Sequence, residues 1–120
     1  MAIFEDLHAL AKTLPRSSEA IVRGRVKFRI GRIVWLAFSR DRRQMGLAFP
    51  KEWRNVVVSA EPEKFIMPSY ADLLYNWLEA RLSALDDEEM HDLVLIACRF
   101  CVATSVAEAY DERTRFLMSP

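Results

Sequence analysis

The sequence contains little of what the commoner catalytic and cofactor sites are built from. It has three isolated glycines, at positions 24, 31 and 46, so neither a phosphate-binding loop nor a dinucleotide fingerprint can be assembled. Its two histidines, His8 and His91, accompany no recognisable pairing of a nucleophile with a base. We therefore expect a protein that is not an enzyme and that carries no cofactor.

Long hydrophobic runs and cysteines are also scarce. The longest apolar runs, residues 33–38 and 93–98, are six residues each, against the roughly 20 that a membrane-spanning helix needs. The N-terminal segment is acidic at Glu5 and Asp6, where a secretion signal is basic, and two cysteines do not make a disulfide framework. These absences predict a soluble cytoplasmic protein that enters no membrane. With 120 residues, 52% of them hydrophobic, we expect one domain, residues 1–120.

Charge is balanced overall but divided between the two halves of the chain. Residues 1–60 carry twelve lysines and arginines against five acids, which gives +7, and residues 61–120 carry five against twelve, which gives −7. Such a division indicates either an anionic partner for the basic half or two halves that attract each other.

Apolar residues at helical spacing predict three helices. Residues 3–14 carry one apolar stripe, and the Leu14-Pro15 step ends this helix because the residue before a proline disfavours the α region. His8 lies off the stripe and is expected in solvent. Residues 86–110 predict a long final helix with Met90, Val94, Ala97 and Cys101 along its centre. Pro50 begins a shorter helix whose expected inner side is Trp53, Val56, Val57 and Ala60.

The pattern changes to a period of two from Val22, which predicts three consecutive strands over residues 22–30, 32–38 and 44–49. A one-residue bulge in the Gly31-Arg32 loop would pair Phe28 with Leu36 and place only apolar side chains on one face of the sheet. The opposite face would then show Arg23, Arg25, Lys27 and Arg29 beside Trp35, Ala37, Ser39 and Gln44.

The remaining part of the chain is less clear. Residues 64–67 predict a short strand that Pro68 closes. Residues 70–82 fit a helix template, but the part from Asn76 to Leu82 also alternates as a strand does.

The order and spacing of several short motifs resemble those of the MmcQ/YjbR family over nearly the whole chain. The matching pieces are Leu14-Pro15 with Glu19, residues 28–32, Phe65 with Pro68 and Tyr70, residues 77–82 leading into Leu85-Asp86, and Glu89, Leu93 and residues 97–99. The resemblance implies a two-layer α+β fold with an antiparallel sheet, the order α-β3-α-β2-α and the helices on one face. This fold is described for the family as frataxin-like (CyaY-like) or as a double-wing DNA-binding domain. The resemblance also assigns residues 76–82 to a strand, and it implies no catalytic residues.

The basic strand face is the leading candidate for a binding site. Cations two residues apart on a strand stand roughly 7 Å from one another, a spacing comparable to that of phosphates along one nucleic-acid strand. Aromatic rings among them would hold bases by stacking. Trp77 and Arg81 would extend the surface if residues 76–82 form a strand. The expected DNA-contacting residues are Arg23, Arg25, Lys27, Arg29, Arg32 and Trp35, with Arg40, Arg42 and Arg43 at the far hairpin.

Four other interpretations stay open. The same face can be a solvated surface whose long side chains cover Trp35, or a protein-interaction or homodimerisation surface that binds no nucleic acid. The acidic run Asp86-Asp87-Glu88-Glu89 can bind a metal in the manner of frataxin, but capping of the last helix accounts for it equally and no metal ligand is assigned. Cys98 and Cys101 have redox-pair spacing, yet they fall inside a helix on its apolar side and are expected to be buried.

Overall fold

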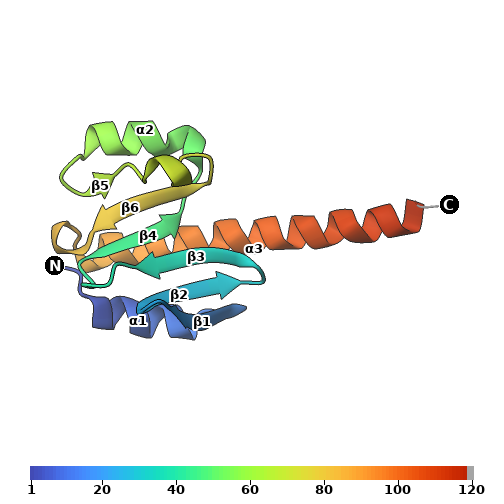
Figure 1. Ribbon diagram of the computed structural model, residues 1–120, viewed down its shortest axis with the longest axis horizontal. Helices are drawn as coiled ribbons and strands as arrows, with labels where there is room; N and C mark the ends of the chain where they lie inside the picture. Colours follow the sequence, from blue (N-terminus) through green and yellow to red (C-terminus); the bar gives the residue numbers. More distant parts are fainter. Residues whose placement is uncertain (119–120) are drawn as a thin grey trace.

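The computed structural model describes the backbone of residues 1–118 and the side chains of residues 1–106. Figure 1 shows the helices arranged around one sheet, with α3 running well beyond the sheet toward the C-terminus. The elements in chain order are α1 (Phe4–Thr13), β1 (Ser17–Val22), β2 (Arg25–Ile30), β3 (Ile33–Phe38), β4 (Gln44–Ala48), α2 (Lys51–Ala60), β5 (Phe65–Ile66), the 3-10 turn η1 (Tyr70–Asp72), β6 (Trp77–Arg81), the 3-10 turn η2 (Leu82–Ala84) and α3 (Asp87–Met118). None of the described helices combines the length and the apolar run needed to cross a bilayer.

The strands form one antiparallel sheet in the order β1-β2-β3-β4-β6-β5. The expected α+β class is therefore correct, but the expected order α-β3-α-β2-α is not, because four strands precede α2. Residues 77–81 form β6, so the strand assignment for this segment holds against its helical periodicity. The last helix reaches Met118, past the predicted end near residue 110.

The additional strand, β1, pairs with β2 through a two-residue turn at Arg23 and Gly24. Both residues have positive φ, 53° and 77°, which is typical of the type I′ turns that join tightly paired strands. The sequence pattern missed β1 because this edge strand buries little, and Ile21 is 72% exposed. As a result Arg23 lies in a turn, and only the residues from Arg25 onward belong to the strand.

The register of β2 against β3 contains the predicted bulge at a different place. Phe28 pairs with Leu36 as expected, but Ile30 pairs with Ile33, so Gly31 and Arg32 form a plain two-residue turn. The irregularity lies between Phe28 and Arg29. Since Arg29 pairs with Val34, Trp35 is the extra residue on β3.

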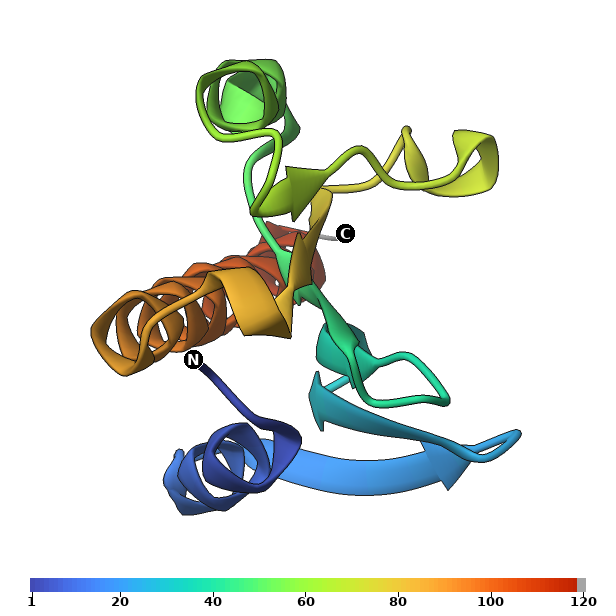
Figure 2. The ribbon, with the colours of Figure 1, turned by 90° about the vertical axis from the view of Figure 1, so that its left-hand side faces the viewer.

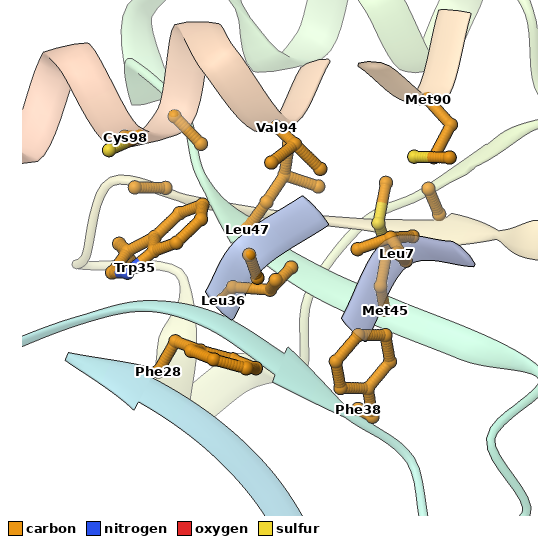
Figure 3. Packing of buried hydrophobic residues seen from close by; sticks show 14 of the residues in the cluster. Leu7, Phe28, Trp35, Leu36, Phe38, Met45, Leu47, Met90, Val94 and Cys98 are labelled. Carbon is orange, nitrogen blue, oxygen red and sulfur yellow. The ribbon is translucent and has the colours of Figure 1, made fainter. Parts of the chain in front are cut away.

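The core fills the space between the sheet and the two helices α1 and α3, which lie on the same side of it, to the left of the sheet in Figure 2. Trp35, Leu36 and Leu47 from the sheet pack toward Val94 and Cys98 of α3 (Figure 3). Phe49 of the predicted apolar face is half-buried against the core, whereas Val34 pairs with the exposed Arg29 and is wrongly assigned to this face. The other predicted members are buried: Val26, Phe28, Ile30, Leu36, Phe38, Met45 and Leu47.

Two side-chain predictions near the helices are wrong. The inner side of α2 consists of Arg54, Val57 and Val58, whereas Trp53 is 64% and Val56 is 62% exposed. Figure 2 shows α2 above the β5–β6 end of the sheet, away from the main core, so this helix buries less than the pattern suggested. His8 is half-buried against the ring of Phe4, and its Nε2 lies 2.5 Å from a carboxylate oxygen of Glu19.

Candidate functional site

An open groove of about 830 Å³ lies between the β1–β2 turn and the β3–β4 turn. Arg25 and Lys27 alternate along β2 with the buried core residues Val26 and Phe28, so the groove belongs to the side of the sheet opposite the core. Four of the predicted cations meet there, two from β2 and one from each turn. The lining residues are Val22, Arg23, Arg25, Lys27, Ser39, Arg40, Asp41 and Gln44.

The β3–β4 turn is held by a compact set of hydrogen bonds. The Ser39 hydroxyl donates to Asp41 at 2.6 Å, and the backbone N–H of Arg43 donates to the same Asp41 oxygen at 3.0 Å. These two bonds hold the pKa of Asp41 below its ordinary value, so Asp41 is the fixed negative charge at the rim of the groove. On the opposite wall, Arg25 Nε donates to the carbonyl of Phe38 at 2.9 Å, which ties the start of β2 to the end of β3.

The groove cations are not neutralised by ion pairs. Within the described residues the ion pairs join His8 to Glu19 and Lys64 to Glu61 and Glu89, all of them outside the groove. Glu79 on β6 is a further carboxylate that interacts electrostatically with a cation of the groove. Burial raises the pKa of Glu79, Asp72 raises it further, and Arg25 lowers it. With four cations and the one carboxylate of Asp41 in its lining, the groove carries a net formal charge of +3.

The structure separates the other predicted cations from this groove. Arg32 lies in the β2–β3 turn, at the opposite end of β2, and Arg29 is exposed beside the bulge. Arg42 turns toward α1, where its guanidinium carbon lies 4.2 Å from the centroid of the Phe4 ring. Arg43 joins Arg42 in a second hollow of about 550 Å³ near the N-terminus.

The predicted aromatic partner, Trp35, is not on this face. It is 0% exposed, its ring lies 6.2 Å from that of Phe28, and its Nε1 donates to the Ser17 hydroxyl at 2.8 Å. The bulge explains the error, because the extra residue at Trp35 changes which positions of β3 point to the core.

Trp77 occupies the outer face instead. It pairs with Ala48, and its indole covers Gly46 so closely that a Cβ on Gly46 would lie 2.4 Å from Cζ2. The neighbouring positions Leu78 and Ala80 are fully buried on the helical side, so the alternation of β6 places Trp77 and Glu79 opposite them.

Arg54 is a structural residue that the sequence analysis did not identify. It is 6% exposed, and its two terminal nitrogens donate to the carbonyls of Leu73, Tyr75 and Trp77 at 2.9–3.1 Å. The available signal was an arginine on the inner stripe of α2, three and four residues before Val57 and Val58. These bonds hold the loop that leads into β6.

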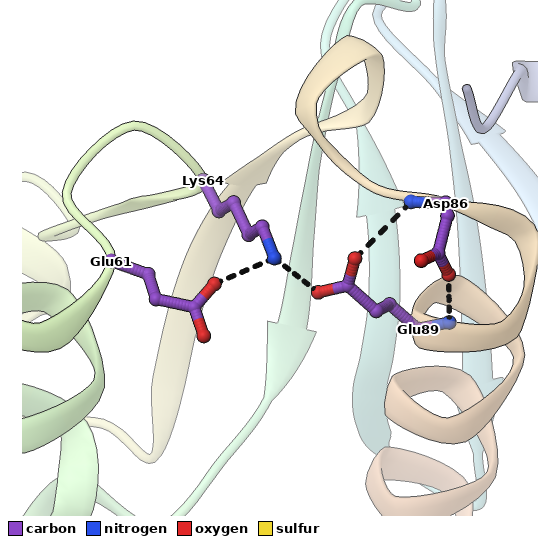
Figure 4. Close-up of polar contacts among 4 residues, drawn as sticks. All are labelled: Glu61, Lys64, Asp86 and Glu89. Atoms are coloured by element: carbon purple, nitrogen blue, oxygen red, sulfur yellow. Dashed lines mark hydrogen bonds and ion pairs between the residues drawn. The ribbon is translucent and has the colours of Figure 1, made fainter.

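The acidic run at the start of α3 caps the helix, as one interpretation predicted. The backbone N–H of Glu89 donates to Asp86 at 2.7 Å and that of Asp86 to Glu89 at 3.4 Å, while Lys64 bridges Glu61 and Glu89 (Figure 4). The described residues contain no group of three or more His, Cys, Asp or Glu side chains placed to hold a metal ion.

The two cysteines are buried, as predicted. Burial raises the pKa of both thiols, that of Cys101 to about 11. A thiol that resists ionisation is a poor nucleophile, so these residues serve the core.

The comparisons with known proteins support the fold and leave the function open. The chain matches no protein-family model, and no curated protein is significantly similar to it. Among solved structures it is similar to the crystal structure of protein DR2400 from Deinococcus radiodurans, which contains a DUF419 domain. The two share 17% sequence identity with a TM-score of 0.67, over 78% of this chain and 74% of that chain. At this identity the similarity shows a shared fold and nothing more.

Proposed function

We propose that this domain is a non-catalytic MmcQ/YjbR-type module that binds nucleic acid in the cytoplasm through the groove between its two hairpin turns. The observation that carries the proposal is the set of cations around that groove, Arg23, Arg25, Lys27 and Arg40, none of which enters an ion pair with a described residue. Such an arrangement releases counterions when it contacts phosphates, and this release supplies most of the affinity in sequence-independent binding.

The shape and the uncharged residues of the groove agree with an extended anion. The site is open along the sheet face, so it admits a strand that passes through it. Arg25 and Lys27 are two residues apart on β2 and stand roughly 7 Å from each other, close to the step between neighbouring phosphates. Ser39 and Gln44 add neutral hydrogen-bonding groups of the kind that position a phosphate backbone.

A titration of fluorescently labelled DNA tests the proposal. Anisotropy would be measured with single- and double-stranded oligonucleotides at low and at physiological salt, for the wild type and for Lys27→Glu/Arg40→Glu. The matched control is Lys12→Glu/Arg99→Glu, which changes the net charge equally at exposed positions on α1 and α3. Four phosphate contacts predict a slope of log K against log salt of about −3 on a single strand.

We expect micromolar binding that weakens with salt, disappears in the groove variant and survives in the control. Absence of binding by the wild type at low salt, or equal losses in both variants, would refute the proposal.

A protein-interaction domain is the second candidate function. The observation that favours it is the set of large apolar side chains left exposed on α2 and on the loop before β6, which are Trp53, Val56, Tyr70, Leu74 and Tyr75. A protein interface centred on these residues would depend little on salt, and sedimentation of the protein at several concentrations would detect self-association.

A further inference from the structure

We propose that Trp77 is the stacking site for an unpaired base, and that single-stranded nucleic acid is therefore the preferred ligand of the groove. This inference rests on the proposed function, because it requires the phosphate backbone to occupy the basic groove.

The sheet register places Trp77 and the groove on one continuous surface. Lys27 pairs with Ala37, Ala37 pairs with Gly46, and Gly46 pairs with Glu79, so these four residues form one row across β2, β3, β4 and β6. Strands are spaced about 4.8 Å apart, so Lys27 and Gly46 are separated by about 10 Å. Between Lys27 and Glu79 the row holds Ala37 and Gly46, which are both buried, and the Trp77 indole covers Gly46.

Gly46 is what allows the indole to lie against the sheet. Its missing Cβ would meet Cζ2, Cε2 and Nε1 of Trp77 at 2.4–2.6 Å, far inside van der Waals contact. The ring is therefore seated on the backbone of β4 and held at a fixed height above the sheet.

The free side of the indole is available to a ligand. Trp77 is half-buried, so the part of its side chain that does not face Gly46 is partly exposed, in contrast to Trp35, which is 0% exposed. The backbone of Trp77 is fixed from behind by Arg54, which also binds Tyr75 and Leu73. A ring that is anchored in advance loses little entropy when a base stacks on it.

Charge indicates which part of the nucleic acid lies where. The cations line the β1–β4 side of the surface, and the carboxylate of Glu79 lies beyond Gly46 on β6. Glu79 repels phosphates, but a carboxylate accepts hydrogen bonds from the exocyclic amino groups of cytosine and adenine. The backbone therefore fits the groove while the base points toward Trp77.

A duplex cannot use this site, because its bases are already stacked on one another. Only a single strand offers an open base face without the energy needed to flip a nucleotide out. Stacking of this kind tolerates any base, since every base has a π face.

The test compares three ligands of equal length: a labelled single strand, its duplex, and a single strand that keeps the phosphates but lacks bases. The variants are Trp77→Ala and Trp77→Phe, with Trp53→Ala as the control for loss of an exposed tryptophan. We expect Trp77→Ala to weaken single-strand binding about 5- to 150-fold with an unchanged salt slope, because no phosphate contact is removed. Trp77→Phe should retain much of the affinity, and Trp53→Ala all of it. The baseless strand should bind the wild type about as weakly as the normal strand binds Trp77→Ala.

The outcomes separate this inference from the proposed function. One outcome would refute the stacking site and leave the proposed groove binding intact. In that outcome, salt-dependent binding is equal for the single strand, the duplex and the baseless strand, and Trp77→Ala does not change it. Absence of binding by the wild type would refute both. If circular dichroism shows that Trp77→Ala does not fold, the baseless strand and Trp77→Phe still test the stacking site. Equal affinity of the wild type for strands with and without bases would exclude stacking.

Discussion

The substitution Gly46→Ala tests most directly whether the Trp77 indole packs against the backbone of β4 at Gly46. The added Cβ would lie 2.4 Å from the indole, and ordinary contact is about 3.5 Å or more, so the ring must move by about 1 Å. Overpacking of this kind costs about 1–3 kcal/mol. Alanine itself is favoured over glycine within a strand by roughly 0.5–1 kcal/mol. The net expectation is a loss of about 0–2.5 kcal/mol, and we would measure it by urea unfolding followed by far-ultraviolet circular dichroism.

A double-mutant cycle identifies the cause of that loss. In a Trp77→Ala background the clash is gone, so Gly46→Ala should stabilise the protein by about 0.5–1 kcal/mol instead. The reversal of sign is specific to contact between the two residues. If Gly46→Ala destabilises the protein equally in both backgrounds, the cost arises elsewhere and the indole is not seated on Gly46.

Three further predictions follow from other parts of the structure. Glu79→Gln should raise the melting temperature at neutral pH, because burial raises the folded-state pKa of Glu79 and makes its ionised form unfavourable. This gain in melting temperature should vanish as the pH falls below the ordinary pKa of 4.5, where the carboxyl is protonated in both the folded and the unfolded state. A gain that does not depend on pH would contradict this cause. Trp35→Phe should destabilise the fold by about 1–3 kcal/mol, because it leaves a small cavity and removes the hydrogen bond to Ser17. The DNA affinity in the anisotropy assay should stay unchanged. A loss of affinity without a loss of stability would show that Trp35 contacts the DNA. Cys101 should react with a thiol reagent only when urea unfolds the protein, because it is buried and its pKa is raised to about 11; rapid labelling of the native protein would show that the core opens.

Much of the core could be predicted because β2, β3 and β4 alternate regularly. Phe28, Leu36 and Leu47 belong to the inner face by sequence and are 0–1% exposed in the structure. Trp35 could not be placed in this way. Its burial depends on one residue inserted into β3 opposite β2, and nothing in the alternation of either strand marks the position of that insertion.

The candidate groove was only partly predictable for a related reason. The spacing of Arg25 and Lys27 on one strand places both on one face whatever the rest of the sheet does. Which arginines of the turn at residues 39–43 join them depends on the conformation of that turn, where Arg42 has a φ of 61° and points toward Phe4. The inner side of α2 was missed because Arg54 is stabilised there by three carbonyls from a loop about twenty residues later, and no local pattern shows such a partner.

The division of charge along the chain now has a structural interpretation. Within the described residues no ion pair joins the two halves, although Arg25 of the basic half attracts Glu79 of the acidic half and lowers the pKa of that carboxyl. His8 and Glu19 both belong to the basic half, whereas Lys64, Glu61 and Glu89 all belong to the acidic half. The acidic half uses these charges to cap α3 and to attach the loop before β5, while the basic half leaves four cations around an open groove. A positive surface that its own chain does not neutralise is costly for a compact fold through self-repulsion. An anionic ligand in the groove would remove that cost, which is the physical basis of the proposed binding.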